Sequence, residues 1–105
     1  LFLMDPETSL LENLVAVTLK KRYGDDLYFY HRNIEVDFYL DEGHKAIQVS
    51  YSIKDLETKE RETDALIKLS KVLPCRRLLI ITFDEESVLQ IEDDSGCAGV
   101  EVVAG

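Results

Sequence analysis

The sequence predicts an α/β domain built on a small mixed sheet with helices on its faces. Two stretches repeat apolar residues at helical spacing, and residues 34–51 alternate apolar and polar residues on both sides of a turn. Residues 78–83 are apolar with little interruption, which is typical of a strand covered on both faces. With 105 residues, 46% of them apolar, the chain can bury one modest core, so we expect a single domain over residues 1–105.

The first helix is predicted to begin at Asp5 and Pro6 and to end at Gly24. Asp is a favoured N-cap, Pro fits the first turn, and Gly commonly follows the last turn. The apolar face between them is formed by Leu10, Leu11, Leu14, Val15, Thr18 and Leu19. The basic run 20–22 falls in the last turn, where cations complement the helix dipole. We therefore interpret these cations as part of the helix end and not as a nucleic-acid patch.

Three consecutive strands are predicted to follow as a meander. Residues 27–30 are rich in aromatic side chains, and residues 34–40 and 46–51 form a hairpin around Glu42-Gly43.

The register of this hairpin follows from its turn. If Glu42-Gly43 is the two-residue loop, Asp37 lies opposite Gln48 and Glu35 lies opposite Ser50. Because strand side chains alternate between faces, we expect a small polar cluster on an apolar frame. The polar face is predicted to hold Glu35, Asp37 and Tyr39, and the other face Ile34, Val36, Phe38 and Leu40.

The second half of the chain predicts a helix and a central strand. Residues 55–73 form an amphipathic pattern whose first half is charged, and Pro74 ends it. A strand–helix–strand connection of this length usually joins parallel strands, which places residues 78–83 in the middle of the sheet. Residues 88–91 and 100–103 predict an extra C-terminal β-hairpin. The predicted order is α-β-β-β-α-β followed by that hairpin.

Charge and composition narrow the classes of function. Twelve Lys and Arg against 21 Asp and Glu give a net charge of −9, which repels a phosphate backbone and disfavours nucleic-acid binding. No apolar run approaches the roughly 20 residues of a membrane span. The two cysteines have no metal-ligand spacing, which fits a reducing cytoplasm. Because the chain begins at Leu1, we expect it to be a piece of a longer protein.

Four short motifs carry a resemblance to a known family. They are LENLV at residues 11–15, EVDF at 35–38, IQVSY at 47–51 and TKERE at 58–62. In order and spacing they resemble the C-terminal domain of unknown function of a large family of prokaryotic AAA+ ATPases. That domain is similar to the PD-(D/E)xK nucleases, so the resemblance implies a restriction-endonuclease-like fold. It also implies that an ATPase module precedes this domain in the same chain.

The resemblance assigns roles to four residues. Glu12 matches the helix carboxylate of the nuclease signature and Asp37 the first strand acid, whereas Gln48 stands where a second acid is usual and Ser50 where Lys is usual. Gln48 supplies no charge to a metal ion, and the Ser50 hydroxyl is not a cation. We therefore expect a catalytically inactive, cofactor-free accessory or interaction domain of a larger ATPase. Its partners would be that ATPase module, other proteins or further copies of itself.

The rival hypothesis is a nuclease with an atypical active site. Glu12, Glu35, Asp37 and the Gln48 amide would then hold Mg²⁺ or Mn²⁺, with Asp37 and Glu35 as the direct carboxylate pair. A DNA-binding module without catalysis is a third hypothesis, which the net charge disfavours.

Each candidate residue also has a structural interpretation. Glu12 fits a capping box with Ser9, in which its carboxylate would reach the Ser9 amide. Asp37 could pair with Gln48 across the hairpin, and Glu35 could point to solvent. Residues 57–62 would be a solvated helix start.

Overall fold

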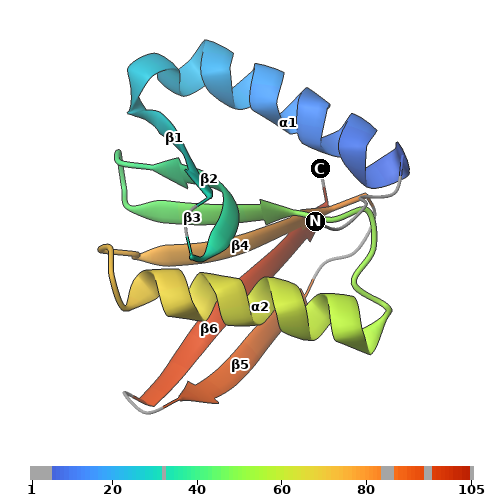
Figure 1. Cartoon of the computed structure of the whole chain (residues 1–105), viewed down its shortest axis with the longest axis vertical. Coiled ribbons are helices and arrows are strands. Elements are labelled where there is room, and N and C mark those ends of the chain that lie inside the picture. The colour runs from blue at the N-terminus through green and yellow to red at the C-terminus, as the bar shows by residue number, and fades with distance from the viewer. Residues whose placement is uncertain (1–5, 32, 84–86, 94–95, 105) are drawn as a thin grey trace.

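Two helices and six strands make up the described part of the chain, which in this computed structural model comprises residues 6–31, 33–83, 87–93 and 96–104 (Figure 1). In chain order the elements are α1 (Pro6–Tyr23), the 3₁₀ turn η1 (Gly24–Asp26), β1 (Leu27–His31), β2 (Glu35–Leu40), β3 (Lys45–Val49), α2 (Leu56–Ser70), β4 (Arg77–Thr82), β5 (Ser87–Asp93) and β6 (Gly96–Ala104). The predicted order of helices and strands is confirmed.

The strands form one mixed sheet in the order β1-β2-β3-β4-β6-β5. The meander β1–β2–β3 is antiparallel, and α2 connects β3 to its parallel neighbour β4. The C-terminal hairpin is antiparallel, but its second strand, β6, also pairs in parallel with β4. The predicted terminal hairpin is therefore part of the sheet, and β4 lies between β3 and β6.

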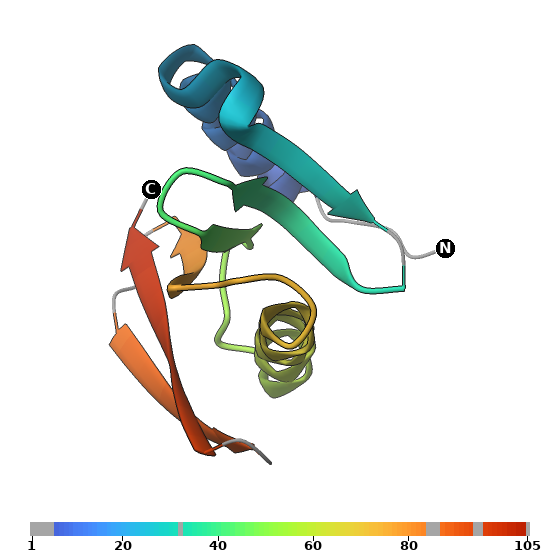
Figure 2. The ribbon, with the colours of Figure 1, turned by 90° about the vertical axis from the view of Figure 1, so that its left-hand side faces the viewer.

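The two helices cover opposite faces of the sheet (Figure 2). The buried cluster on the α1 side of the sheet contains Leu11, Val15, Leu27, Phe38, Leu40, Ile47, Val49 and Leu79. The cluster on the α2 side includes Val36, Tyr39, Ala46, Leu66, Leu69, Leu78, Ile80, Val100 and Val102. The continuous apolar run of β4 divides between these two clusters, which explains why it lacks alternation.

The end of α1 and the start of α2 agree with the sequence signals, but α2 ends at Ser70, four residues before the Pro74 that was predicted to end it. Gly24 follows α1 with a φ of +56°, a backbone conformation that Gly adopts at little cost. The predicted cap Asp5 lies outside the described residues. At α2, the Asp55 carboxylate accepts the Thr58 N–H at 3.0 Å, as an N-cap should. The capping box of Ser9 and Glu12 is wrong, because α1 already begins at Pro6 and Ser9 lies inside it.

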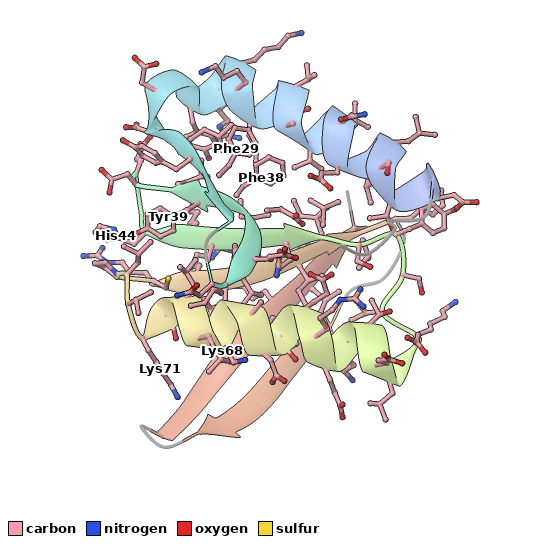
Figure 3. All side chains as sticks on the ribbon, viewed as in Figure 1. Phe29, Phe38, Tyr39, His44, Lys68 and Lys71 are labelled. Atoms are coloured by element: carbon pink, nitrogen blue, oxygen red, sulfur yellow. The ribbon has the colours of Figure 1, made fainter. Side chains whose placement is uncertain are left out.

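Near its turn, the β2–β3 hairpin has the predicted register, but its ladder ends at Phe38–Ile47, so the predicted pair of Glu35 and Ser50 does not form. The pairs Leu40–Lys45, Tyr39–Ala46 and Phe38–Ile47 are those that a Glu42-Gly43 loop requires, and Gly43 has a φ of +78°. The Tyr39 hydroxyl donates to the Pro74 carbonyl at 2.6 Å and lies 3.2 Å from His44 Nδ1 (Figure 3). The Tyr39–Pro74 hydrogen bond thus connects the turn end of the hairpin to the segment that follows α2.

A β-bulge in β2 overturns the predicted division of faces. Tyr28 pairs with Tyr39 and Tyr30 with Val36, so two residues of β2 stand opposite the single residue Phe29 of β1. The extra residue reverses the alternation. Val36 consequently packs with Tyr39 in the α2 cluster, whereas we expected it to share a face with Phe38 and Leu40.

Candidate functional site

The candidate site is a fork where β2 and β3 separate. The backbone pairs of this ladder end at Phe38–Ile47. Beyond that point β3 continues along β4, since the Ser50 N–H donates to the Ile81 carbonyl at 3.0 Å and the Phe83 N–H donates to the Tyr51 carbonyl at 3.1 Å. A separation of this kind leaves backbone groups of β2 and β3 without ladder partners, and side chains must bind them instead.

Gln48 bridges the fork from β3 to β2. Its Nε2 donates to the Glu35 carbonyl at 3.0 Å, and its Oε1 accepts the Asp37 N–H at 3.0 Å. The side chain is buried, with 2% of its surface exposed. The amide therefore acts as an inserted peptide group, with one donor and one acceptor facing two groups of β2.

Asp37 bridges the fork in the reverse direction. Its Oδ2 accepts the Val49 N–H at 2.8 Å, a charge-assisted bond from a half-buried carboxylate. Asp37 and Gln48 are neighbours across the hairpin, as the register predicted. Their contact differs from the predicted polar pair, because the Gln48 side chain binds the main chain of Asp37 and the Asp37 side chain binds the main chain of β3.

Ser50 and Thr8 close the end of the fork. The buried Ser50 hydroxyl donates to the Ser52 carbonyl at 3.0 Å, which shapes the turn after β3. The buried Thr8 hydroxyl accepts the Tyr51 N–H at 3.0 Å and so attaches the first turn of α1 to the fork. Thr8 could not be predicted as a site residue, because a Thr near a helix start gives no signal for a contact 43 residues away.

Carboxylates from both helices approach the fork. Burial, the charge of Asp37 and, to a smaller extent, the charge of Glu12 together raise the pKa of Glu62 on α2 from 4.5 to about 7, although Arg61 opposes the rise. The Glu62 side chain is only 15% exposed, and its carboxylate lies 3.7 Å from the Arg61 guanidinium. The fork thus contains a carboxyl group that holds a proton near neutral pH.

Glu62 is a site residue that the sequence analysis missed. We expected residues 57–62 to be a solvated helix start, and this is wrong for Glu62. A signal was available, since Glu62 precedes the buried Leu66 and Leu69 by four and seven residues and therefore lies on the same helix face.

The remaining predicted metal ligand, Glu35, has an exposed side chain, and its carbonyl is the group that contacts Gln48. Across the described ranges, no three Asp, Glu, His or Cys side chains are grouped closely enough to hold one metal ion. The charges of Asp37 and Glu12 both raise the pKa of Glu62, so acids from β2, α1 and α2 interact electrostatically. They do not form a preassembled metal site.

Comparison with protein-family models, with curated proteins and with solved structures found no match to this chain. Among the described residues, neither helix combines the length and the apolar character that crossing a membrane requires.

Proposed function

We propose that this chain is a restriction-endonuclease-like domain that has lost nuclease chemistry and serves as an accessory interaction domain of a larger AAA+ ATPase. The α-β-β-β-α-β order, a helix on each face of the sheet and a polar fork between the second and third strands support the nuclease-like fold. The proposed link to an ATPase comes from the four short motifs that resemble the family domain.

The observation that carries the loss of activity is the hydrogen bonding of the fork. At the three strand positions of the nuclease signature, Asp37, Gln48 and Ser50 each bond to a backbone group. Gln48 uses both ends of its amide in this way. These side chains make hydrogen bonds in place of the missing ladder bonds. Amide and hydroxyl groups can fill that structural role as well as charged groups can.

The chemistry available at these positions supports the same proposal. Metal-assisted phosphodiester hydrolysis needs anionic oxygens around the metal ion and a group that stabilises the developing charge. Gln48 is neutral, and Ser50 cannot carry a positive charge. With a pKa of about 7, Glu62 is close to half protonated at neutral pH, so it is a weakened metal ligand there.

A second candidate function is a divalent-metal nuclease with an atypical ligand set. One observation favours it: Asp37 and Glu12 both raise the pKa of Glu62, and a cation near the fork would relieve that repulsion. Asp37 and Glu62 would then hold Mg²⁺ or Mn²⁺, with water completing the ligand set, since no third acid of the described residues lies close enough to both.

Thermal unfolding with and without Mn²⁺ separates the two candidates. At pH 8 we expect Mn²⁺ to shift the Tm of the wild type and of Asp37→Asn by the same amount. A metal ion that bound the Asp37 carboxylate in the folded state would raise the Tm of the wild type more than that of the variant. Incubation of the wild type with DNA and RNA in Mn²⁺ should leave both intact. An increase in Tm that is confined to the wild type, together with cleavage that Asp37→Asn abolishes, would establish the nuclease.

The association with an ATPase has its own test. We expect the natural protein to contain a phosphate-binding loop of the pattern GxxxxGK[ST] upstream of Leu1. A natural chain without such a loop would remove the ATPase from the proposal and leave the inactive fork unaffected.

A further inference from the structure

Helix α1 has a second apolar face that points away from the sheet. Leu11 and Val15 are buried against the sheet, but Leu10, Leu14 and Val17 are 71%, 64% and 54% exposed. The spacing of these three residues, four and then three, aligns them in one stripe along the helix. A helix that needs only one buried face rarely exposes such a stripe, so the stripe suggests a protein contact.

A groove lies beside this stripe, between α1 and the edge strand β1. It has a volume of about 540 Å³ and is lined by Ala16, Val17, Lys20, Lys21, Leu27 and Phe29. Phe29 is 62% exposed and contacts Phe38 with a ring separation of 5.5 Å (Figure 3). Val17 belongs to both features, so the stripe and the groove form one continuous apolar surface, which we call the α1 surface.

Charges at the two ends of the α1 surface are arranged symmetrically. Glu7 lies seven residues before Leu14, and Lys21 lies seven residues after it. Both are exposed, and seven residues are close to two helical turns, so both fall on the side of α1 that carries the stripe. The stripe is therefore acidic at one end, basic at the other and apolar in the middle.

We propose that the occupant of the α1 surface is a second copy of this chain, packed antiparallel about a twofold axis near Leu14. In that arrangement Glu7 of each copy faces Lys21 of the other, and Leu10 of each copy enters the other's surface beside Val17. A parallel arrangement would instead place Glu7 against Glu7. Self-complementary charge is what an isologous interface requires, and it is the reason for choosing a second copy over an unrelated partner.

This inference specifies one contact of the proposed interaction domain, but it does not depend on the fork. Glu12 and Glu62 have no part in it. The dimer would survive the discovery of a nuclease activity, and the inactive fork would survive the discovery of a monomer. The test therefore measures the mass of the protein in solution and does not measure metal binding or cleavage at the fork.

The first experiment measures the mass of the wild type by sedimentation equilibrium over a wide concentration range. Salt near 0.15 M screens the repulsion between two chains of charge −9 beyond about 8 Å and leaves contacts at the interface. We expect the mass to rise from 12.0 kDa to twice that value. Leu14→Glu should weaken the dimer by about 100-fold, because it places two carboxylates on the axis of an apolar contact.

Leu56→Glu is the matched control for that variant. Leu56 is 65% exposed on α2, so it receives the same change of residue outside the α1 surface. We expect its dimerisation to equal that of the wild type. Far-ultraviolet circular dichroism should be unchanged in both variants, since neither side chain is buried. Their Tm should equal that of the wild type at a concentration where the wild type is monomeric, because dimerisation itself raises Tm.

A charge reversal distinguishes the antiparallel geometry from any other apolar contact. Glu7→Lys and Lys21→Glu should each weaken the dimer by about tenfold, and the double variant should restore it to within about threefold of the wild type. Lys68→Glu, an exposed change of the same sign on α2, is the control for Lys21→Glu. A monomer at every concentration overturns the proposal, and so does a dimer that is insensitive to Leu14→Glu or is not restored in the double variant.

Discussion

The two ends of the β2–β3 hairpin are held together by different interactions. At the turn end, a regular backbone ladder joins the strands, and the side chains of Phe38, Leu40 and Ile47 are almost fully buried. At the fork, the ladder is absent, and the side chains of Asp37 and Gln48 bind the backbone across the gap. One end derives its stability from apolar burial, and the other from a few polar contacts in a field of repelling carboxylates.

The difference shows where this domain gives up stability. Burying Glu62 near Asp37 opposes its ionisation, a cost that the turn end does not carry. Regions with such costs are often functional sites, although structural networks produce them as well. Variants at the two ends of the hairpin should therefore differ in both the size and the pH dependence of their effects on stability.

Phe38→Ala should cause the largest loss and would weaken the turn end. Phe38 is fully buried beside α1, and removal of a buried Phe costs about 3–5 kcal/mol because the cavity does not fully collapse. We expect the free energy of unfolding in urea to fall by about 4 kcal/mol, a large part of the stability of a small domain. The exposed Phe29, whose ring contacts Phe38, is the matched control, and Phe29→Ala should cost far less. Equal losses for the two rings would contradict this account.

Glu62→Gln should stabilise the fork, by an amount that depends on pH. Because the pKa of Glu62 is about 7 in the folded state and 4.5 when unfolded, the folded state binds the proton more tightly. Stability from this group is complete below pH 4.5 and is lost as the pH rises through 7. The glutamine variant avoids that loss, so its free energy of unfolding should exceed that of the wild type by up to about 3 kcal/mol at pH 8.

The pH dependence provides the control for this prediction. At pH 5 we expect little difference between Glu62→Gln and the wild type, because most Glu62 is protonated in the folded state. Glu60→Gln, an exposed neighbour on α2, should show no such trend. In Asp37→Asn, the pKa of Glu62 should fall, and a carbon-detected titration of the Glu62 carboxyl would measure it. A stability gain that is the same at both pH values would rule out the buried acid as the cause.

Gln48→Met should cause a loss of about 2 kcal/mol at the fork. The change keeps the length and apolar stem of the side chain but leaves the Asp37 N–H and the Glu35 carbonyl without the amide, and an unsatisfied buried group costs about 1–3 kcal/mol. Urea unfolding measures the loss. Ser50→Ala, which removes a single bond to the Ser52 carbonyl, should cost about half as much. An unchanged Gln48→Met would show that the fork does not need the bridge.

Local patterns predicted most of the fold. The Gly at position 24, the Asp55 cap and the Glu42-Gly43 turn act over a few residues. The end of α1, the start of α2 and the register next to the hairpin turn could therefore be anticipated from neighbours in sequence. The bulge in β2 could not, because it depends on how β1 pairs with β2. The place of β6 between β4 and β5 is also a tertiary result, since its own sequence specifies only an apolar strand.

The candidate site was predicted in part. The hairpin turn places Asp37 and Gln48 near each other, and the structure has them as neighbours. The roles of both side chains in replacing ladder bonds follow only from the separation of β2 and β3. Thr8 and Glu62 reach the fork from helices on opposite faces of the sheet, and contacts of that kind depend on packing across long sequence separations.

The sequence alone determined the order of elements, the turn and the acidic charge, because these depend on residue type and short-range periodicity. Only the tertiary structure decided which polar groups meet and which apolar face of α1 stays exposed. Alternation and helical spacing assign side chains to faces within one element. The elements that pack against a helix or strand decide which of its faces is buried. They also decide which groups surround a buried carboxyl on that face.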